Sequence, residues 1–193
     1  MRIKIDMRSF TGVILLIIMG QGTIINGYAQ IYQSKDNTIT FFSEAPLEDI
    51  TAITEKAVAI VNIQTGEIAA RVPIKSFEFK KALMQEHFNE QYMESEKFPY
   101  AIFQGQFLDV ERLRNLESGN YRIKGKMSIH GVTKSFEKTV SVKLENDSLY
   151  SKTKFLVKLA DYEIKIPKIL VQNIAEIIEV EVTLNLKKTT GNE

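Results

Sequence analysis

Hydrophobic and polar residues alternate along most of the chain beyond residue 30. From Tyr121 to Ile129 the apolar side chains occupy every second position, with basic and small polar residues between them. The alternation resumes after His130 and Gly131 and runs from Phe136 to Leu144, interrupted by a lysine. A period of two is typical of a strand that buries one face. The pattern therefore predicts a β-hairpin that turns at His130 and Gly131, and a valine in place of Gly131 should destabilise it.

The same period recurs in other segments. It predicts strands over residues 38–43, 57–63, 67–74, 101–107, 151–159 and 177–186, and a shorter alternating piece over residues 161–167. Residues 45–54 carry the acids and the proline of a loop or a short helical turn. The chain after residue 30 thus contains about eight strands.

One segment has a helical period instead. Between residues 79 and 94, apolar and aromatic side chains recur at spacings of three and four, while Lys, Glu, Gln and Asn fill the opposite side. The helical pattern stops before Pro99, because the residue before a proline favours extended geometry. We expect one amphipathic helix that lies on the sheet or across its mouth.

These elements predict an all-β fold, because many antiparallel strands must close or stack to protect their edges. We expect an antiparallel, lipocalin-like barrel of about eight strands with the helix near one mouth. A barrel of this size is either filled by side chains or holds one small ligand. Its inward positions are mainly Phe, Ile and Val, so a ligand inside would be apolar.

The first 29 residues differ from the rest. Basic residues precede an apolar run over residues 10–19, which is shorter than the roughly 20 residues that a membrane-spanning helix needs. Gly27 and Ala29 are small residues at the positions that a signal peptidase requires. We therefore expect a signal peptide over residues 1–29, cleaved before Gln30, and a single domain over residues 30–193 in the periplasm.

Composition removes several classes of function. The first 29 residues hold three of the chain's 25 Lys and Arg and one of its 24 Asp and Glu, which leaves 22 basic and 23 acidic residues in the predicted domain. This balance gives no electrostatic support for nucleic-acid binding. The chain has no cysteine, so it offers no thiol nucleophile and no Cys-based zinc site. We also find no phosphate-binding glycine loop and no nucleophile motif.

The two histidines are the candidates for a catalytic or metal-binding role. His130 lies in the predicted turn, where its imidazole could contact a head group or a metal, or bond to nearby backbone. His87 lies on the apolar stripe of the helix, as a metal ligand or as a half-buried residue that caps the core. No third ligand stands at metal spacing beside either histidine, since the chain has no His-x-x-x-His or Glu-x-x-His pattern here. The acids at positions 86, 90, 94 and 96 fit a solvated helix face. We predict no catalytic residue, no metal and no cofactor.

Several short motifs resemble those of the YceI-like family of secreted bacterial proteins. They are Phe98-Pro99-Tyr100-Ala101-Ile102-Phe103, the turn Ile129-His130-Gly131-Val132-Thr133, and Phe155 followed by Asp161-Tyr162-Glu163-Ile164. Residues 83–95 are similar to a variant of Bacteroidetes-type members. The resemblance implies an exported lipocalin-like barrel whose apolar tunnel binds an isoprenoid chain, such as a polyprenyl lipid or a quinone tail.

We therefore expect a non-enzymatic periplasmic carrier or sequestering protein for such a lipid. The predicted tunnel residues are Phe41, Phe103, Phe107, Tyr121, Ile123, Met127, Phe155 and Val157, and the predicted mouth residues are His87, Phe88 and Tyr92. An alternative is a structural or partner-binding envelope module with a side-chain-filled barrel. A homodimer and a protein partner for the helix stay open.

Overall fold

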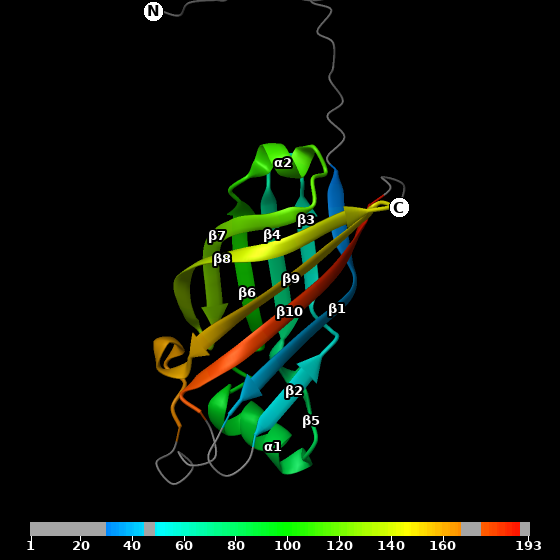
Figure 1. Ribbon diagram of the computed structural model, residues 1–193. Helices are drawn as coiled ribbons and strands as arrows, with labels where there is room; N and C mark the ends of the chain where they lie inside the picture. The colour runs from blue at the N-terminus through cyan, green and yellow to red at the C-terminus, as the bar shows by residue number, and fades with distance from the viewer. Residues whose placement is uncertain (1–29, 45–48, 167–174, 190–193) are drawn as a thin grey trace, which may run out of the picture.

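The computed structural model describes residues 30–44, 49–166 and 175–189, so the predicted signal peptide lies outside the described residues. Eight antiparallel strands form a closed ring (Figure 1). In ring order they are β1 (Ile31–Ser43), β3 (Val58–Asn62), β4 (Glu67–Pro73), β6 (Tyr100–Phe107), β7 (Gly119–Ile129), β8 (Val132–Glu145), β9 (Ser148–Lys158) and β10 (Ile177–Lys188). Pairing of β10 with β1 closes the ring. The predicted eight-stranded barrel is confirmed.

Two further strands extend one rim. The strand β2 (Ile50–Thr54) pairs with the second half of β1, and β5 (Glu78–Phe79) pairs with β2. β2 and β3 pair with β1 in the same register, because Ile39 of β1 pairs with Thr54 of β2 and Gln33 of β1 pairs with Ile60 of β3. They are therefore two parts of one strand that bends at residues 55–57.

A buried amide holds this bend. The side chain of Asn37 donates to the carbonyl oxygen of Ala57 (3.0 Å) and accepts from the backbone N–H of Asn185 (3.1 Å). Ser34 donates its hydroxyl to the carbonyl oxygen of Ala59 (2.9 Å). These bonds satisfy backbone groups where the register of β1 against β10 shifts between residues 34 and 36.

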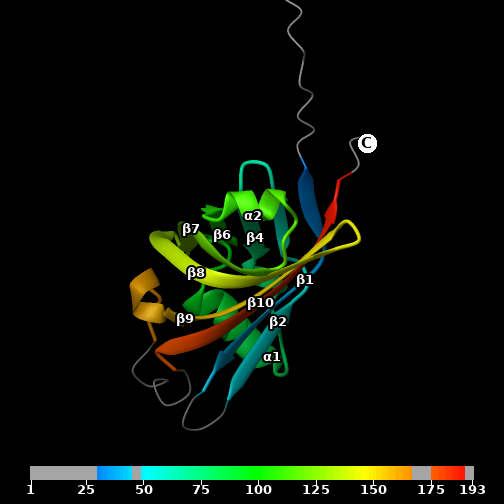
Figure 2. The same cartoon turned by 45° about the horizontal axis from the view of Figure 1, so that its top comes forward.

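Two helical segments lie at opposite ends of the barrel (Figures 1 and 2). The helix α1 (Ala82–His87) continues into a π-helical turn (Phe88–Tyr92), and α2 (Val110–Arg114) follows β6. We call the two ends the α1 end and the α2 end. The first helix lies within the predicted segment, whereas α2 was not predicted, because five residues are too short for a clear helical period.

The α2 end is filled by side chains. The largest side chains of the hydrophobic cluster at this end are fully buried; they include Ile63, Leu113 and Tyr121. The ring of Tyr121 meets that of Phe107 edge-on, with centroids 5.8 Å apart, and its hydroxyl donates to the carbonyl oxygen of Glu117 (2.5 Å). Leu113 of α2 packs into the same cluster. This half of the barrel is a packed core.

Strands β8 and β9 pair over only part of their length. The ladder joins residues 141–145 of β8 to residues 148–152 of β9. Lys134 and Lys138 stand opposite the buried Met127 and Ile123 in the β7–β8 register, yet both lysines are exposed. The two strands therefore separate toward the α1 end, as Figure 1 shows. We call this stretch, residues 132–140 and 153–158, the open seam.

Two sequence predictions are corrected. Residues 50–54 form β2 rather than a loop or helical turn, because the Ile-Thr-Ala-Ile-Thr alternation fits the edge of β1. Residues 159–162 form a 3-10 turn, whereas alternation predicted an extended piece from residue 161. Tyr162 and Ile164 are both buried, and Glu163 between them adopts a left-handed φ of 55°. Their spacing of two reflects a tight turn, not a strand.

Candidate functional site

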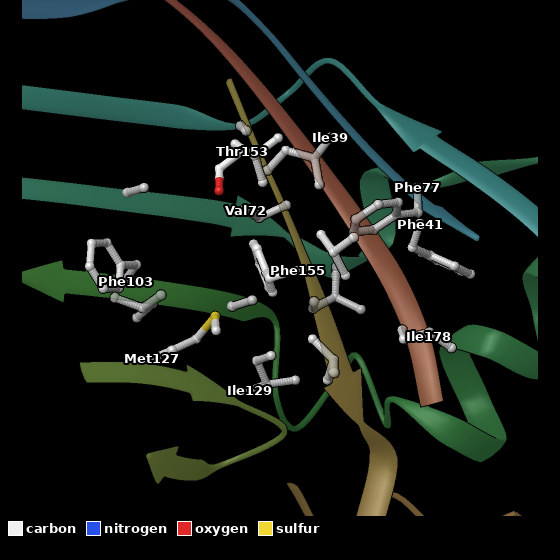
Figure 3. Close-up of a pocket in the computed structure, with 18 of the residues that line it drawn as sticks. Ile39, Phe41, Val72, Phe77, Phe103, Met127, Ile129, Thr153, Phe155 and Ile178 are labelled. Carbon is white, nitrogen blue, oxygen red and sulfur yellow. The ribbon is translucent and has the colours of Figure 1, made fainter. Parts of the chain in front are cut away.

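A cavity of about 500 Å³ lies inside the barrel and extends from the α1 end inward to the buried cluster of the α2 end, members of which, such as Phe107 and Leu186, form its inner wall. Side chains from β1, β4, β6, β7, β9 and β10 converge on it, as Figure 3 shows for Phe41, Val72, Phe103, Met127, Phe155 and Ile178. All but six of the lining residues are apolar; the exceptions are Ser43, Lys81, His87, Tyr92, Ser151 and Thr153. Its size falls within the usual range for ligand pockets of roughly 300–1,000 Å³.

Aromatic rings form much of the wall. Phe41, Phe77, Phe79 and Phe88 gather near α1, with centroids 5.0–5.7 Å apart in the closest pairs. Farther in, Phe136 meets Phe103 at 5.5 Å and Phe155 at 4.9 Å, both edge-on. Because Phe136 and Phe155 come from the two sides of the open seam, their contact closes it from inside. These surfaces attract an apolar chain without directional bonds.

The structure brings seven of the eight predicted tunnel residues onto the cavity wall. They are Phe41, Phe103, Phe107, Ile123, Met127, Phe155 and Val157. The exception is Tyr121, which has the inward phase but lies in the packed core of the α2 end, on the far side of Phe107. A contact between these residues and a ligand stays a prediction.

Sequence reasoning missed part of the wall. The residues Ile178, Val180 and Val182 of β10 line the cavity. Their alternation was visible and could have identified them, since they share a face with Leu184 and Leu186. Phe77 and Phe79 were also missed, because a 3-10 turn (Ile74–Ser76) and the two-residue β5 give no clear period.

The predicted mouth residues lie together at the α1 end. His87, Phe88 and Tyr92 all line the cavity, with Leu83 and Lys81 beside them. The side chain of Leu83 is 61% exposed while it lines the cavity, so the cavity reaches solvent here. Burial raises the pKa of the Tyr92 phenol above its ordinary value.

His130 does not line the cavity but contacts residues of three segments beside it. Its Nδ1 donates to the carbonyl oxygen of Tyr162 (3.1 Å), and its Nε2 lies 3.0 Å from Oε2 of Glu94. Phe98 packs edge-on against the imidazole, with centroids 4.5 Å apart. His130 therefore links these segments, and its bond to the Tyr162 carbonyl fits the alternative in which the imidazole bonds to backbone rather than to a ligand or a metal. Sequence reasoning missed Glu94 as its partner, since the two residues lie 36 positions apart.

His130 and Gly131 form a two-residue hairpin turn with φ angles of 51° and 76°. Such a turn requires positive φ at both positions. A Cβ atom on Gly131 would lie only 2.6 Å from Cε1 of Phe98. The glycine is therefore needed both for its backbone angle and for the packing of Phe98.

Across residues 30–44, 49–166 and 175–189, no helix is long and apolar enough to cross a membrane. A family model described as the YceI-like domain matches residues 33–187. A search of curated proteins found no match.

Solved structures share the fold at low sequence identity. A polyisoprenoid-binding domain from Saccharophagus degradans, implicated in plant cell wall breakdown, is 15% identical; the match has a TM-score of 0.72 and covers 82% of this chain and 98% of that one. BcnA from Burkholderia cenocepacia is 14% identical, with a TM-score of 0.62 and coverage of 79% and 96%. The YCEI protein of Campylobacter jejuni is 12% identical, with a TM-score of 0.55 and coverage of 70% and 81%.

The family model spans most of the chain, and the barrel is the one that the sequence motifs imply. This chain belongs to the YceI-like family.

Proposed function

We propose that the protein is a non-enzymatic periplasmic carrier or sequestering protein that holds the apolar chain of an isoprenoid-type lipid inside its barrel. The apolar cavity of about 500 Å³ is the observation that carries the proposal. The polyisoprenoid-binding domain of the same fold supports this ligand class. The signal-like residues 1–29 support export.

Burial of apolar surface supplies the affinity. Each CH₂ group of the lipid that leaves water for this cavity contributes about 0.8 kcal/mol. The wall imposes no directional bond along most of its length, so the protein discriminates among apolar chains mainly by length and width. The alternative of a wholly side-chain-filled barrel is less favoured, because only the α2 end is filled.

No catalytic constellation supports a competing enzymatic function in the described part of the chain. His87 lines the cavity, whereas His130 is engaged by Glu94 and Tyr162. The acids Glu86, Glu90, Glu94 and Glu96 line a second pocket beside α1 and not the barrel cavity, and there Glu96 pairs with Lys75 and Glu94 with His130.

The test is to purify the protein from its own host, extract it with organic solvent and analyse the extract by mass spectrometry. We expect an isoprenoid lipid at near-stoichiometric amount, and saturable binding of a polyprenyl or quinone analogue to the extracted protein. A lipid-free extract together with no binding on titration would exclude the proposed function.

A further inference from the structure

The cavity has few polar side chains, and two of them are engaged in hydrogen bonds with the backbone. Ser43 accepts from the backbone N–H of Ala175 (2.9 Å), and Thr153 donates to the carbonyl oxygen of Thr139 (3.1 Å). Ser151 lies deeper, on β9 opposite Leu184 of β10. Lys81 is exposed at the rim. The remaining two polar residues, His87 and Tyr92, both line the cavity at the α1 end.

These two side chains retain hydrogen-bonding capacity. Within the described residues, neither the imidazole of His87 nor the hydroxyl of Tyr92 has a hydrogen-bond partner. The Tyr92 hydroxyl is a donor at neutral pH, as any phenol with its ordinary pKa is, and burial raises this pKa further. A neutral imidazole offers one donor and one acceptor. The wall of an apolar cavity thus carries two polar side chains with free hydrogen-bonding capacity at the α1 end, and a few polar groups in an apolar pocket are what fix a ligand's orientation.

The π-helical turn explains why both groups face the same cavity. In an α-helix, residues five apart point about 140° apart around the axis. Here the N–H of Met93 donates to the carbonyl oxygen of Phe88 (2.9 Å), five residues back, and the wider turn rotates less per residue. Tyr92 is thereby brought toward the face that already carries His87. Such turns are often associated with functional sites.

Charge narrows the kind of group that fits between them. Lys81 is the one cavity-lining residue with a permanently charged side chain in the described part of the chain, and it is exposed. A phosphate head group would require several charge-assisted bonds, and the cavity lining offers one lysine and no arginine for them within the described residues. A carbonyl or hydroxyl oxygen needs only a neutral donor and acceptor.

We propose that His87 and Tyr92 form a head-group site for an uncharged oxygen function, a carbonyl or hydroxyl, at the end of an isoprenoid-type chain. This rests on the proposed function. The chain occupies the cavity, and the head-group oxygen accepts from Tyr92 and bonds with His87 at the mouth.

The experiment compares four ligands of matched chain length: a prenol, a prenyl-tailed quinone, a prenyl phosphate and an isoprenoid hydrocarbon. Lipid-extracted protein is titrated by displacement of a fluorescent polyene, for the unsubstituted chain and for Tyr92→Phe, His87→Leu and Lys81→Gln. Tyr100→Phe is the matched control, since Tyr100 is exposed on β6 and does not line the cavity. Thermal melting verifies that each variant folds.

We expect Tyr92→Phe and His87→Leu each to weaken prenol and quinone binding about 2- to 10-fold, as the loss of one hydrogen bond implies. Hydrocarbon binding should not change with Tyr92→Phe. The head-group site is refuted if the prenyl phosphate binds most tightly and depends on Lys81, or if Tyr92→Phe weakens all four ligands equally. Hydrocarbon binding as tight as prenol binding would refute the site but leave the carrier function, whereas no binding of any ligand would refute both.

Discussion

The two ends of this barrel are built from the same alternating strands but differ in how their interiors are filled. At the α2 end, Leu113 and Tyr121 fill the interior, and the β8–β9 ladder is intact. At the α1 end, residues of the same phase border a cavity, and β8 and β9 separate. The α2 end is packed and fully paired, whereas the α1 end retains the space in which we propose that the lipid lies.

Different side chains account for the contrast. The α2 end has a short helix that places Leu113 in the interior, and Tyr121 with Phe107 fills the space beneath it. The α1 end has a longer helical segment, which contains no fully buried residue and packs the rings of Phe88 and Tyr92 against the buried clusters around the cavity. Interiors are normally close-packed, so a retained cavity of about 500 Å³ costs stability. We expect mutations at the two ends to separate stability from binding.

The largest contrast between an effect on stability and an effect on ligand binding should come from comparing Leu113→Ala with Ile178→Ala. Leu113 is 0% exposed in the packed core, so its truncation should lower the free energy of unfolding by about 2–5 kcal/mol. Ile178 already borders the cavity, and its truncation should cost less stability but weaken binding of a prenyl ligand about tenfold. Urea unfolding and ligand titration measure the two quantities.

Leu113→Ala should leave affinity unchanged under conditions where it is folded. If both variants lost equal stability and equal affinity, the division of the barrel into a structural end and a binding end would be wrong.

The next largest effect is expected at the hairpin tip of the α1 end. Gly131→Val forces a β-branched residue to a φ of 76° and against the Phe98 ring, so it should lower the free energy of unfolding by about 2–3 kcal/mol. Ser135→Val is the control, because Ser135 is exposed on the following strand. A melting temperature unchanged from that of the parent would contradict the positive-φ argument.

A third prediction concerns the bend between the two ends. Asn37→Ala leaves the carbonyl of Ala57 and the N–H of Asn185 without their side-chain partner, which should lower the free energy of unfolding by about 2 kcal/mol. Asn62→Ala is the matched control, because Asn62 only caps the β3–β4 turn. Equal losses in chemical unfolding would show that burial of the Asn37 amide adds nothing.

The strands of both ends could be predicted because burial imposes a period of two on the sequence. The hairpin at His130 and Gly131 is an example, since its turn residues and its alternation agree. The period cannot tell a packed core from a cavity wall: Tyr121 and Met127 share one phase on β7, yet only Met127 lines the cavity. That difference depends on α2, which fills one end.

Other features arise from contacts between distant segments. The bend held by Asn37, the π-helical turn and the bond between Glu94 and His130 involve partners 20 or more residues apart or a local departure from the α-helix. The open seam did leave a sign in the sequence, because Lys138 interrupts the apolar phase of β8. The sequence alone could not show that this interruption marks a gap between strands. That conclusion needed the β7–β8 register, in which the exposed Lys138 pairs with the buried Ile123.

The smallest predicted effect distinguishes the open seam from the intact ladder. Thr153→Val removes the bond to the Thr139 carbonyl in the seam, and Ser141→Ala removes the bond to the Lys152 carbonyl beside the ladder. Each should cost about 0.5–1 kcal/mol at most. Thr153→Val should accelerate hydrogen exchange of the β8 amides that point away from β7 before residue 141, because no backbone ladder replaces the lost bond there. Ser141→Ala should leave exchange slow, since the neighbouring backbone pairs persist. Equal acceleration in both variants would mean that the β8–β9 edge opens as one unit, and the contrast between the two ends would then not extend to their dynamics.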